Sequence, residues 1–183
     1  HEDLATLARE GVSHLAIEAS SHGIDQHRLD GLRLAAAAFT NLTHEHLDYH
    51  HSMDAYFAAK ARLFEVLLPP GGTAVVNADS PEAMRMAEQT RAQVVRYGLE
   101  HASAEVHVRG GFVWQRTSEG DTPLLPLAAV QLAGRHMLSN VVAATAISHL
   151  AGATDASLAR ALDGFTGLEH VMEPAGHRGG VRF

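Results

Sequence analysis

The chain has 183 residues and a mass of 19.6 kDa, which allows about one globular domain and excludes a large multidomain assembly. Its hydrophobic fraction of 46%, charged fraction of 19% and mean hydropathy of -0.06 are typical of a folded globular protein, and no apolar run reaches the ~20 residues of a membrane span. The net charge of -7 is opposite in sign to that of a general nucleic-acid binder, and the lack of cysteine excludes disulfides and thiolate zinc sites. The composition therefore predicts a globular protein with no nucleic-acid or membrane partner.

Apolar spacing in the first half of the chain predicts an alternation of helices and strands. In chain order the expected elements are a helix over 2–10, a buried strand over 12–17, an apolar run over 34–39, a helix over 54–67, a strand over 73–77, a helix over 80–91 and a strand over 93–97. Strands separated by helices of this length indicate βαβ units, in which the strands run parallel and both faces of the sheet are covered.

The second half begins with a different pattern. Short apolar segments between glycine and proline turns over 105–130 predict a small antiparallel β excursion, and helices are expected over 138–150 and 155–162. The predicted fold class is therefore α/β, with a Rossmann-like, mostly parallel sheet flanked by helices and a small antiparallel excursion.

A polar cluster follows the strand expected over 12–17. It contains Glu18, Ser20, Ser21 and His22. Because open α/β sheets bind ligands beyond the carboxyl ends of their strands, this cluster is a candidate for contact with a metal or phosphate. The alternative is an ordinary polar loop at the end of a strand.

A second cluster, over 43–51, is rich in histidine and follows the apolar run over 34–39. Imidazoles ligate metals or donate hydrogen bonds to phosphates. One interpretation is a metal-dependent hydrolase that uses His44, His46 and His50, as in the HxHxDH signature of metallo-β-lactamase-like enzymes. The match fails by one place, because Asp48 is followed by Tyr49 rather than by histidine, and ligand spacing decides which side chains can converge.

Lys60 is the single lysine among 14 basic residues, the other 13 being arginine. Arginine can replace lysine where only positive charge is needed, but an ammonium can lose its proton or be modified, whereas a guanidinium stays charged. The pattern indicates a chemical role for Lys60 on the helix expected over 54–67. The alternative is a surface lysine whose stem lies along the helix.

A third group, over 134–140, lies at the start of the helix expected over 138–150. Asn140 suits recognition of a base edge, with Arg135 or His136 packed beside it, although Ser139 and Asn140 are also typical of a helix start.

Taken together, these segments resemble the central domain of the Mur ligases, and among these ligases they are most similar to those that add the third amino acid to the muramyl peptide. The resemblance is dense over 11–79 and fair over 124–167. The segments that carry it are Glu18 to Gly23, Gln26, Arg28, Phe39 to Thr43, His46 to His50, Tyr56 to Lys60 and Gly134 to Asn140.

The resemblance implies an ATP-dependent ligase, in which a carboxylate is phosphorylated and an amine attacks the acyl phosphate to form an amide. It implies that Lys60 is carbamylated, so that a cation becomes an anion able to hold a second magnesium ion. Glu18 and His46 match residues around the magnesium ions, and His46 and Lys60 are the implied catalytic residues. Hard oxygen ligands suit Mg²⁺, and imidazole is the exception among its ligands.

The implied substrates are ATP, an amino acid, either diaminopimelate or lysine, and UDP-N-acetylmuramoyl-L-alanyl-D-glutamate. Ser20, Gln26 and Arg28 align with residues that hold the UDP-muramyl substrate. Because UDP-linked precursors and ATP are made in the cytoplasm, a cytoplasmic enzyme of peptidoglycan synthesis is expected.

Nucleotide contacts are implied at Asn140, which matches an adenine contact, and at Arg135 and His136 beside it. Met137 departs from the family, which usually has asparagine there, and the chain has no glycine-rich phosphate loop ending in Gly-Lys-Thr/Ser. We therefore expect an internal fragment that is inactive and prone to self-association when isolated.

By the same resemblance, residues 1–167 form the central, ATP-binding domain without its phosphate-loop segment, and residues 168–183 begin a truncated C-terminal ligase domain. Besides the hydrolase, one alternative stays open, a truncated module that keeps the fold and has no activity.

Overall fold

The computed structural model describes residues 2–132, 134–167 and 176–182. Its main sheet has six strands in the order β1-β2-β3-β4-β5-β6. The strands are β1 Ala36–Phe39, β2 Thr73–Asn77, β3 Gln93–Gly98, β4 Val106–Arg109, β5 Phe112–Thr117 and β6 Gly120–Pro126. The first four run parallel, whereas β5 and β6 continue the sheet antiparallel. The predicted fold class is confirmed.

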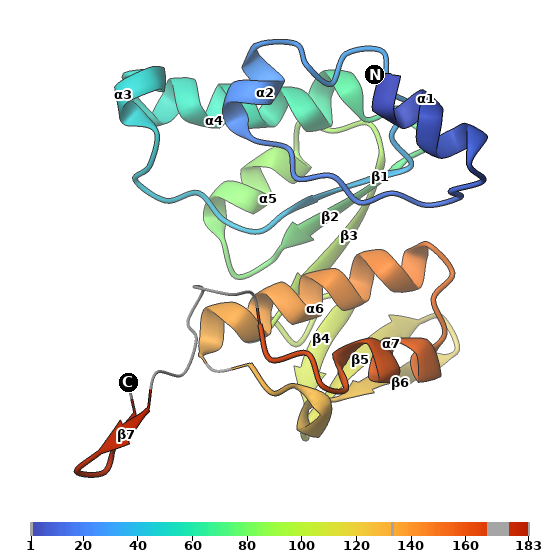
Figure 1. Ribbon diagram of the computed structural model, residues 1–183, viewed down its shortest axis with the longest axis vertical. Coiled ribbons are helices and arrows are strands. Elements are labelled where there is room, and N and C mark those ends of the chain that lie inside the picture. The colour runs from blue at the N-terminus through green and yellow to red at the C-terminus, as the bar shows by residue number, and fades with distance from the viewer. Residues whose placement is uncertain (1, 133, 168–175, 183) are drawn as a thin grey trace.

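Helices cover both faces of this sheet (Figure 1). They are α1 Glu2–Arg9, α2 Ser21–Asp25, α3 Leu47–His50, α4 Met53–Arg62, a π-helical turn η1 Leu63–Leu67, α5 Pro81–Ala87, a 3₁₀ turn η2 Leu127–Ala129, α6 Arg135–Leu150 and α7 Asp155–Leu162. In Figure 1, α2 and α4 lie above β1, and α6 and α7 lie below it. Among the described residues, no helix is both long and apolar enough to cross a membrane.

Two hydrophobic cores lie on the opposite faces of the sheet, and neighbouring residues of β2 contribute to different cores. Val76 packs with Phe64 of η1 and Met86 at the end of α5. Val75 packs with Val142 of α6 on the other face. Side chains alternate across a strand and both faces here are covered, so the β2 residues after Thr73 are all buried.

The sequence prediction is correct for several element boundaries. Strand β2 and helix α7 have the expected bounds, and the strand expected over 93–97 is β3 with one further residue. Ser80 begins α5 as expected, because its side chain accepts a hydrogen bond from the Ala83 N–H and Pro81 occupies the first helical position.

The strand expected over 12–17 is wrong, since this segment has no secondary structure. Its apolar side chains Val12, Leu15 and Ile17 are 43%, 52% and 48% exposed. In Figure 1 the segment passes β1 as irregular chain, and among the described strands β1 pairs only with β2. Without burial or ladder hydrogen bonds, β propensity does not produce a strand.

Other boundaries also differ from the predictions. The helix expected over 54–67 is α4 followed by the π-helical turn η1, α5 ends at Ala87, and α6 begins at Arg135. Asn140 therefore lies inside α6 rather than at its start. Helices α2 and α3 were not expected, because each has only four or five residues and shows little periodicity.

The domain boundary expected after residue 167 lies next to residues 168–175, which are outside the described residues. Beyond them, β7 His177–Arg178 and β8 Val181–Arg182 form a two-stranded antiparallel hairpin. The division into 1–167 and 168–183 stays a prediction.

Candidate active site

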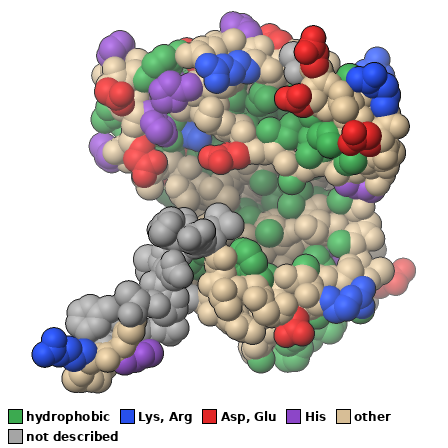
Figure 2. Space-filling model, viewed as in Figure 1, with side chains coloured by type: hydrophobic (Ala, Val, Ile, Leu, Met, Phe, Trp, Pro, Cys, Tyr) green, Lys and Arg blue, Asp and Glu red, His purple; other side chains and the backbone are tan. Residues whose placement is uncertain are grey.

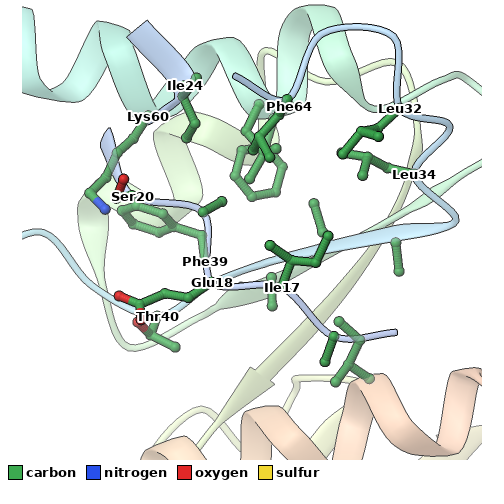
Figure 3. A pocket seen from close by; sticks show the side chains of 18 of the residues that line it. Ile17, Glu18, Ser20, Ile24, Leu32, Leu34, Phe39, Thr40, Lys60 and Phe64 are labelled. Carbon is green, nitrogen blue, oxygen red and sulfur yellow. The ribbon is translucent and has the colours of Figure 1, made fainter. Parts of the chain in front are cut away.

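A cavity of about 1130 Å³ lies between the 13–21 segment, β1 and the ends of α4 and α6. In the space-filling view, apolar side chains show in the hollow between the upper and lower parts of the molecule (Figure 2). Figure 3 shows that the cavity has two chemically different ends. Lys60, Ser20, Glu18 and Thr40 lie toward one end, and apolar side chains including Leu34 lie toward the other.

Four of the residues expected in the site line this one cavity: Glu18, Ser20, His46 and Lys60. They come from separate parts of the chain. Glu18 and Ser20 belong to the segment that enters α2, and Ser20 caps that helix by accepting a hydrogen bond from the Gly23 N–H. His46 precedes α3 in a left-handed backbone conformation, with φ 59°, which is uncommon for a residue other than glycine.

The amine of Lys60 is half-buried on α4, and this burial lowers its pKa from the usual value. The nearby carboxylates of Glu18 and Glu45 oppose that change, because they favour the charged ammonium. The Nζ atom lies 5.3 Å from the centre of the Tyr56 ring. A lowered pKa increases the fraction of neutral amine, which is the form that reacts with electrophiles.

The donor set at the polar end fits magnesium in its chemistry. Glu18 and Glu45 supply carboxylates, and Thr40 and Thr43 supply hydroxyls that line the same cavity. Hard oxygen donors of this kind are the ones Mg²⁺ prefers. Glu45 was not among the expected residues, although its place between two histidines was a signal for it.

The His44, His46 and His50 side chains do not form a metal-ligand group, although the His46 and His50 rings both pack near His22, with centroids 5.0 and 5.5 Å from it. His50 is buried, and its Nε2 lies 2.9 Å from the Ser21 hydroxyl. The pKa of His50 is lowered mainly by its burial and to a lesser extent by the nearby His22 ring. His44 is exposed and does not line the cavity. Within the described part of the chain, no three His, Asp or Glu side chains are grouped to hold a metal ion, so the structure gives the hydrolase interpretation no ligand set.

The two other residues expected to bind substrate lie outside the cavity. Gln26 is exposed at the end of α2, where its Nε2 donates a 3.4 Å hydrogen bond to the Tyr49 hydroxyl. Arg28 is also exposed. Ser20 is thus the member of this trio that shares the cavity with Lys60.

The residues expected at the nucleotide form a separate group in the first two turns of α6. Arg135 is paired with Glu100 at 2.6 Å, and His136 and Asn140 are exposed on the same helix. None of the three lines the cavity described above.

Beside this group, Asp79 organises the loop after β3, a role that the sequence analysis missed. Its carboxylate accepts hydrogen bonds from the N–H groups of Leu99 and His101, and it lies 2.8 Å from the His101 ring Nδ1. Burial raises its pKa, but the hydrogen bonds outweigh this and lower the pKa overall. The Asn-Ala-Asp sequence over 77–79, which begins with the last residue of β2, was the available signal.

Comparison with known proteins places these features in a family. The sequence model of the Mur ligase middle domain matches residues 1–148. The chain belongs to the Mur ligase family. The hydrolase interpretation is thereby replaced, and the histidine-rich segment is part of a Mur ligase middle domain.

Relatives agree with this assignment. The chain is 38% identical to the UDP-N-acetylmuramoyl-L-alanyl-D-glutamate--2,6-diaminopimelate ligase of Bradyrhizobium diazoefficiens, over 99% of this chain and 39% of that protein. It is 42% identical to the ligase of the same name from Caulobacter vibrioides, over 96% of this chain and 37% of that protein. The chain therefore spans about two fifths of the length of these Mur ligases.

Solved structures show the same fold. A structure of a UDP-N-acetylmuramoyl-L-alanyl-D-glutamate--2,6-diaminopimelate ligase matches 97% of this chain and 37% of its own, with a TM-score of 0.79 and 26% identity. A MurF structure from Acinetobacter baumannii matches 78% of this chain and 32% of its own, with a TM-score of 0.60 and 19% identity, which supports the fold alone.

Proposed function

We propose that this chain is the central part of a cytoplasmic, ATP-dependent ligase that adds diaminopimelate to UDP-N-acetylmuramoyl-L-alanyl-D-glutamate in peptidoglycan synthesis. The observation that carries the proposal is the shared cavity of Glu18, Ser20, His46 and Lys60 in a Mur ligase middle domain. The names of the relatives support diaminopimelate over lysine.

In this proposal, ATP supplies the phosphoryl group that activates the dipeptide carboxylate, and magnesium neutralises the charge of the phosphates. Glu18 and His46 would hold the metal, together with the modified side chain of Lys60. Ser20 contacts the UDP-muramyl substrate at the cavity, and Gln26 and Arg28 extend that contact along α2 and the following loop. Asn140, Arg135 and His136 form the nucleotide side at the start of α6.

Lys60 acts as a carbamate in this proposal. The neutral amine forms an N–C bond to carbon dioxide and releases one proton, so the side chain becomes an anion and joins the oxygen donors of Glu18. The partly buried position, which lowers the pKa of Lys60, favours this reaction because it increases the neutral fraction. Arginine at this place would stay a cation.

The experiment uses the full-length gene product and measures phosphate release from ATP. Release should require both the UDP-dipeptide and diaminopimelate, and lysine in place of diaminopimelate should give a far lower rate. Release that proceeds equally with lysine would overturn the substrate assignment, and release that needs no UDP-dipeptide would overturn the ligase proposal.

Two substitutions test the role of Lys60. Lys60→Ala should abolish turnover and recover part of it with short carboxylic acids that replace the carbamate. Lys60→Arg should be inactive without rescue, because its charged side chain still fills the space. Near-native turnover of Lys60→Arg would show that Lys60 holds no metal.

The 183-residue chain alone is expected to release no phosphate from ATP, because it contains no Gly-Lys-Thr/Ser sequence. In phosphoryl transfer, nearly all catalysis is positioning and charge stabilisation by such a loop and its partners. ATP-dependent phosphate release by this chain, stimulated by the UDP-dipeptide, would contradict the expectation.

A further inference from the structure

A buried hydrogen bond joins two segments of the candidate site that are distant in sequence. The Ser21 hydroxyl and the His50 Nε2 lie 2.9 Å apart, and the two residues are 1% and 7% exposed. Ser21 is the first residue of α2 and His50 is the last residue of α3. If either side chain were replaced, the other would be left buried without this hydrogen bond. The free-energy cost of such an unpaired buried group is larger than the contribution of an exposed hydrogen bond.

The His50 ring continues this link toward Lys60. It stacks on the buried Tyr56 ring, with centroids 5.2 Å apart and planes inclined by 22°. The same Tyr56 ring lies 5.3 Å from the Lys60 Nζ and packs edge-on against His46, with centroids 5.9 Å apart. Tyr56 therefore packs beside both Lys60 and His46, and His50 stacks on its ring.

The other end of the link is the segment that enters α2. Ser20, which lines the cavity, directly precedes Ser21 and caps α2. A second contact supports the same pairing of helices, because the Tyr49 hydroxyl of α3 donates a 2.8 Å hydrogen bond to Asp25 of α2.

We propose that Ser21 and His50 form a positioning pair. Their hydrogen bond fixes the position of Ser20 relative to Lys60 and His46. This inference rests on the proposed function, since it assumes that Ser20 contacts the UDP-dipeptide and that Lys60 and His46 serve the reaction. Ser21 and His50 act through their neighbours. Loss of the pair should therefore weaken binding of the UDP-dipeptide, whereas loss of a purely structural contact should not.

The test uses the full-length gene product with Ser21→Ala, His50→Phe, His50→Gln and the double variant Ser21→Ala/His50→Phe. His50→Phe keeps a ring against Tyr56 and removes the hydrogen bond, whereas His50→Gln places an amide nitrogen near the former Nε2 position. Ser157→Ala is the control, because the Ser157 hydroxyl also makes a hydrogen bond, to the Thr154 carbonyl at 2.7 Å, but lies on α7 and does not line the cavity.

Two measurements accompany each variant. One is the KM for the UDP-dipeptide and kcat. The other is the Kd of the UDP-dipeptide by calorimetry in EDTA, which reports binding without metal or turnover. Ser21→Ala and His50→Phe should each raise KM and Kd about tenfold, the double variant no further, and His50→Gln should recover most of the loss. Ser157→Ala should stay within about twofold of the unmodified protein.

Three results would overturn the inference. Unchanged KM and Kd in Ser21→Ala and His50→Phe would show a purely structural pair. Losses that multiply in the double variant would show that the two residues act separately, and a His50→Gln variant as impaired as His50→Phe would show that the hydrogen bond is not what matters. If the unmodified protein does not bind the UDP-dipeptide at all, the proposed function fails and this inference fails with it.

Discussion

Two apolar segments with similar β propensity differ in structure, because one is a strand and the other is irregular. The 73–77 segment is strand β2, and its Val75 and Val76 are fully buried. The 12–17 segment, Val-Ser-His-Leu-Ala-Ile, has no secondary structure, and its largest apolar side chains are about half exposed. Of the two, only the 73–77 segment is hydrogen-bonded to β1, whereas a cavity lies between the 13–21 segment and β1.

The difference lies in the number of partners. β2 has parallel ladders to both β1 and β3, with α5 packed near one face and α6 near the other. The 12–17 segment has neither ladders nor a covering helix. Burial and cross-strand pairing supply most of what is measured as β propensity, so an apolar pattern without partners stays irregular.

The largest test of this comparison places a carboxylate in each segment of the 183-residue chain. Val76→Asp should cost more than about 4 kcal/mol of the free energy of unfolding, because an unpaired charge would be buried in a closely packed core. Leu15→Asp should change it by less than about 0.5 kcal/mol, because that side chain is 52% exposed. Urea-induced unfolding followed by circular dichroism measures both, and an equal loss would mean that 12–17 is buried in solution.

A smaller effect is expected when a serine just after β2 or a serine within the 12–17 segment is replaced. Ser80, just after β2, caps α5 and donates a 3.0 Å hydrogen bond to Glu82. Ser80→Ala should cost about 1 kcal/mol of the free energy of unfolding, as for other helix caps. Ser13→Ala should cost only a few tenths of a kcal/mol, because its contact with His14 is exposed. Thermal and urea unfolding of the two variants provide the comparison, which a larger loss for Ser13→Ala would reverse.

The smallest expected effect concerns the loop at Asp30, which has no strand structure but is held to α4 by an ion pair. Arg62 of α4 donates hydrogen bonds of 2.8 and 2.7 Å to the two carboxylate oxygens of Asp30. These bonds, and to a lesser extent the hydrogen bond with His27, lower the pKa of Asp30 from 3.8 to about 2. A lowered carboxyl pKa stabilises the folded state above pH 3.8, and this contribution is lost as the pH falls through about 2.

Asp30→Asn should therefore be slightly less stable than the unmodified chain at pH 7, and the difference should shrink between about pH 4 and pH 2. Unfolding midpoints at a series of pH values test this. A difference that grows on acidification would show that the ion pair does not set the Asp30 pKa.

Much of the candidate site could be predicted from the sequence. Lys60 was singled out as the sole lysine, and Glu18, Ser20 and His46 were singled out as polar residues after apolar runs; all four line one cavity. Gln26, Arg28 and the Asn140 group were expected from the family resemblance, and the structure places them outside that cavity. The role of Asp79 in the loop after β3 was missed, because it depends on N–H groups about 20 residues later in the chain.

The sequence by itself determined the α/β class, the bounds of β2 and α7, the cap of α5 and the family, because these depend on local apolar spacing, capping residues and matched motifs. Only the tertiary structure decided that 12–17 is not a strand, that α4 continues into a π-helical turn, and that His50 is bonded to Ser21 rather than free to ligate a metal. These outcomes depend on contacts between residues far apart in the chain. Strand pairing and burial are properties of the neighbours that a segment meets, and the segment's own residues do not specify them.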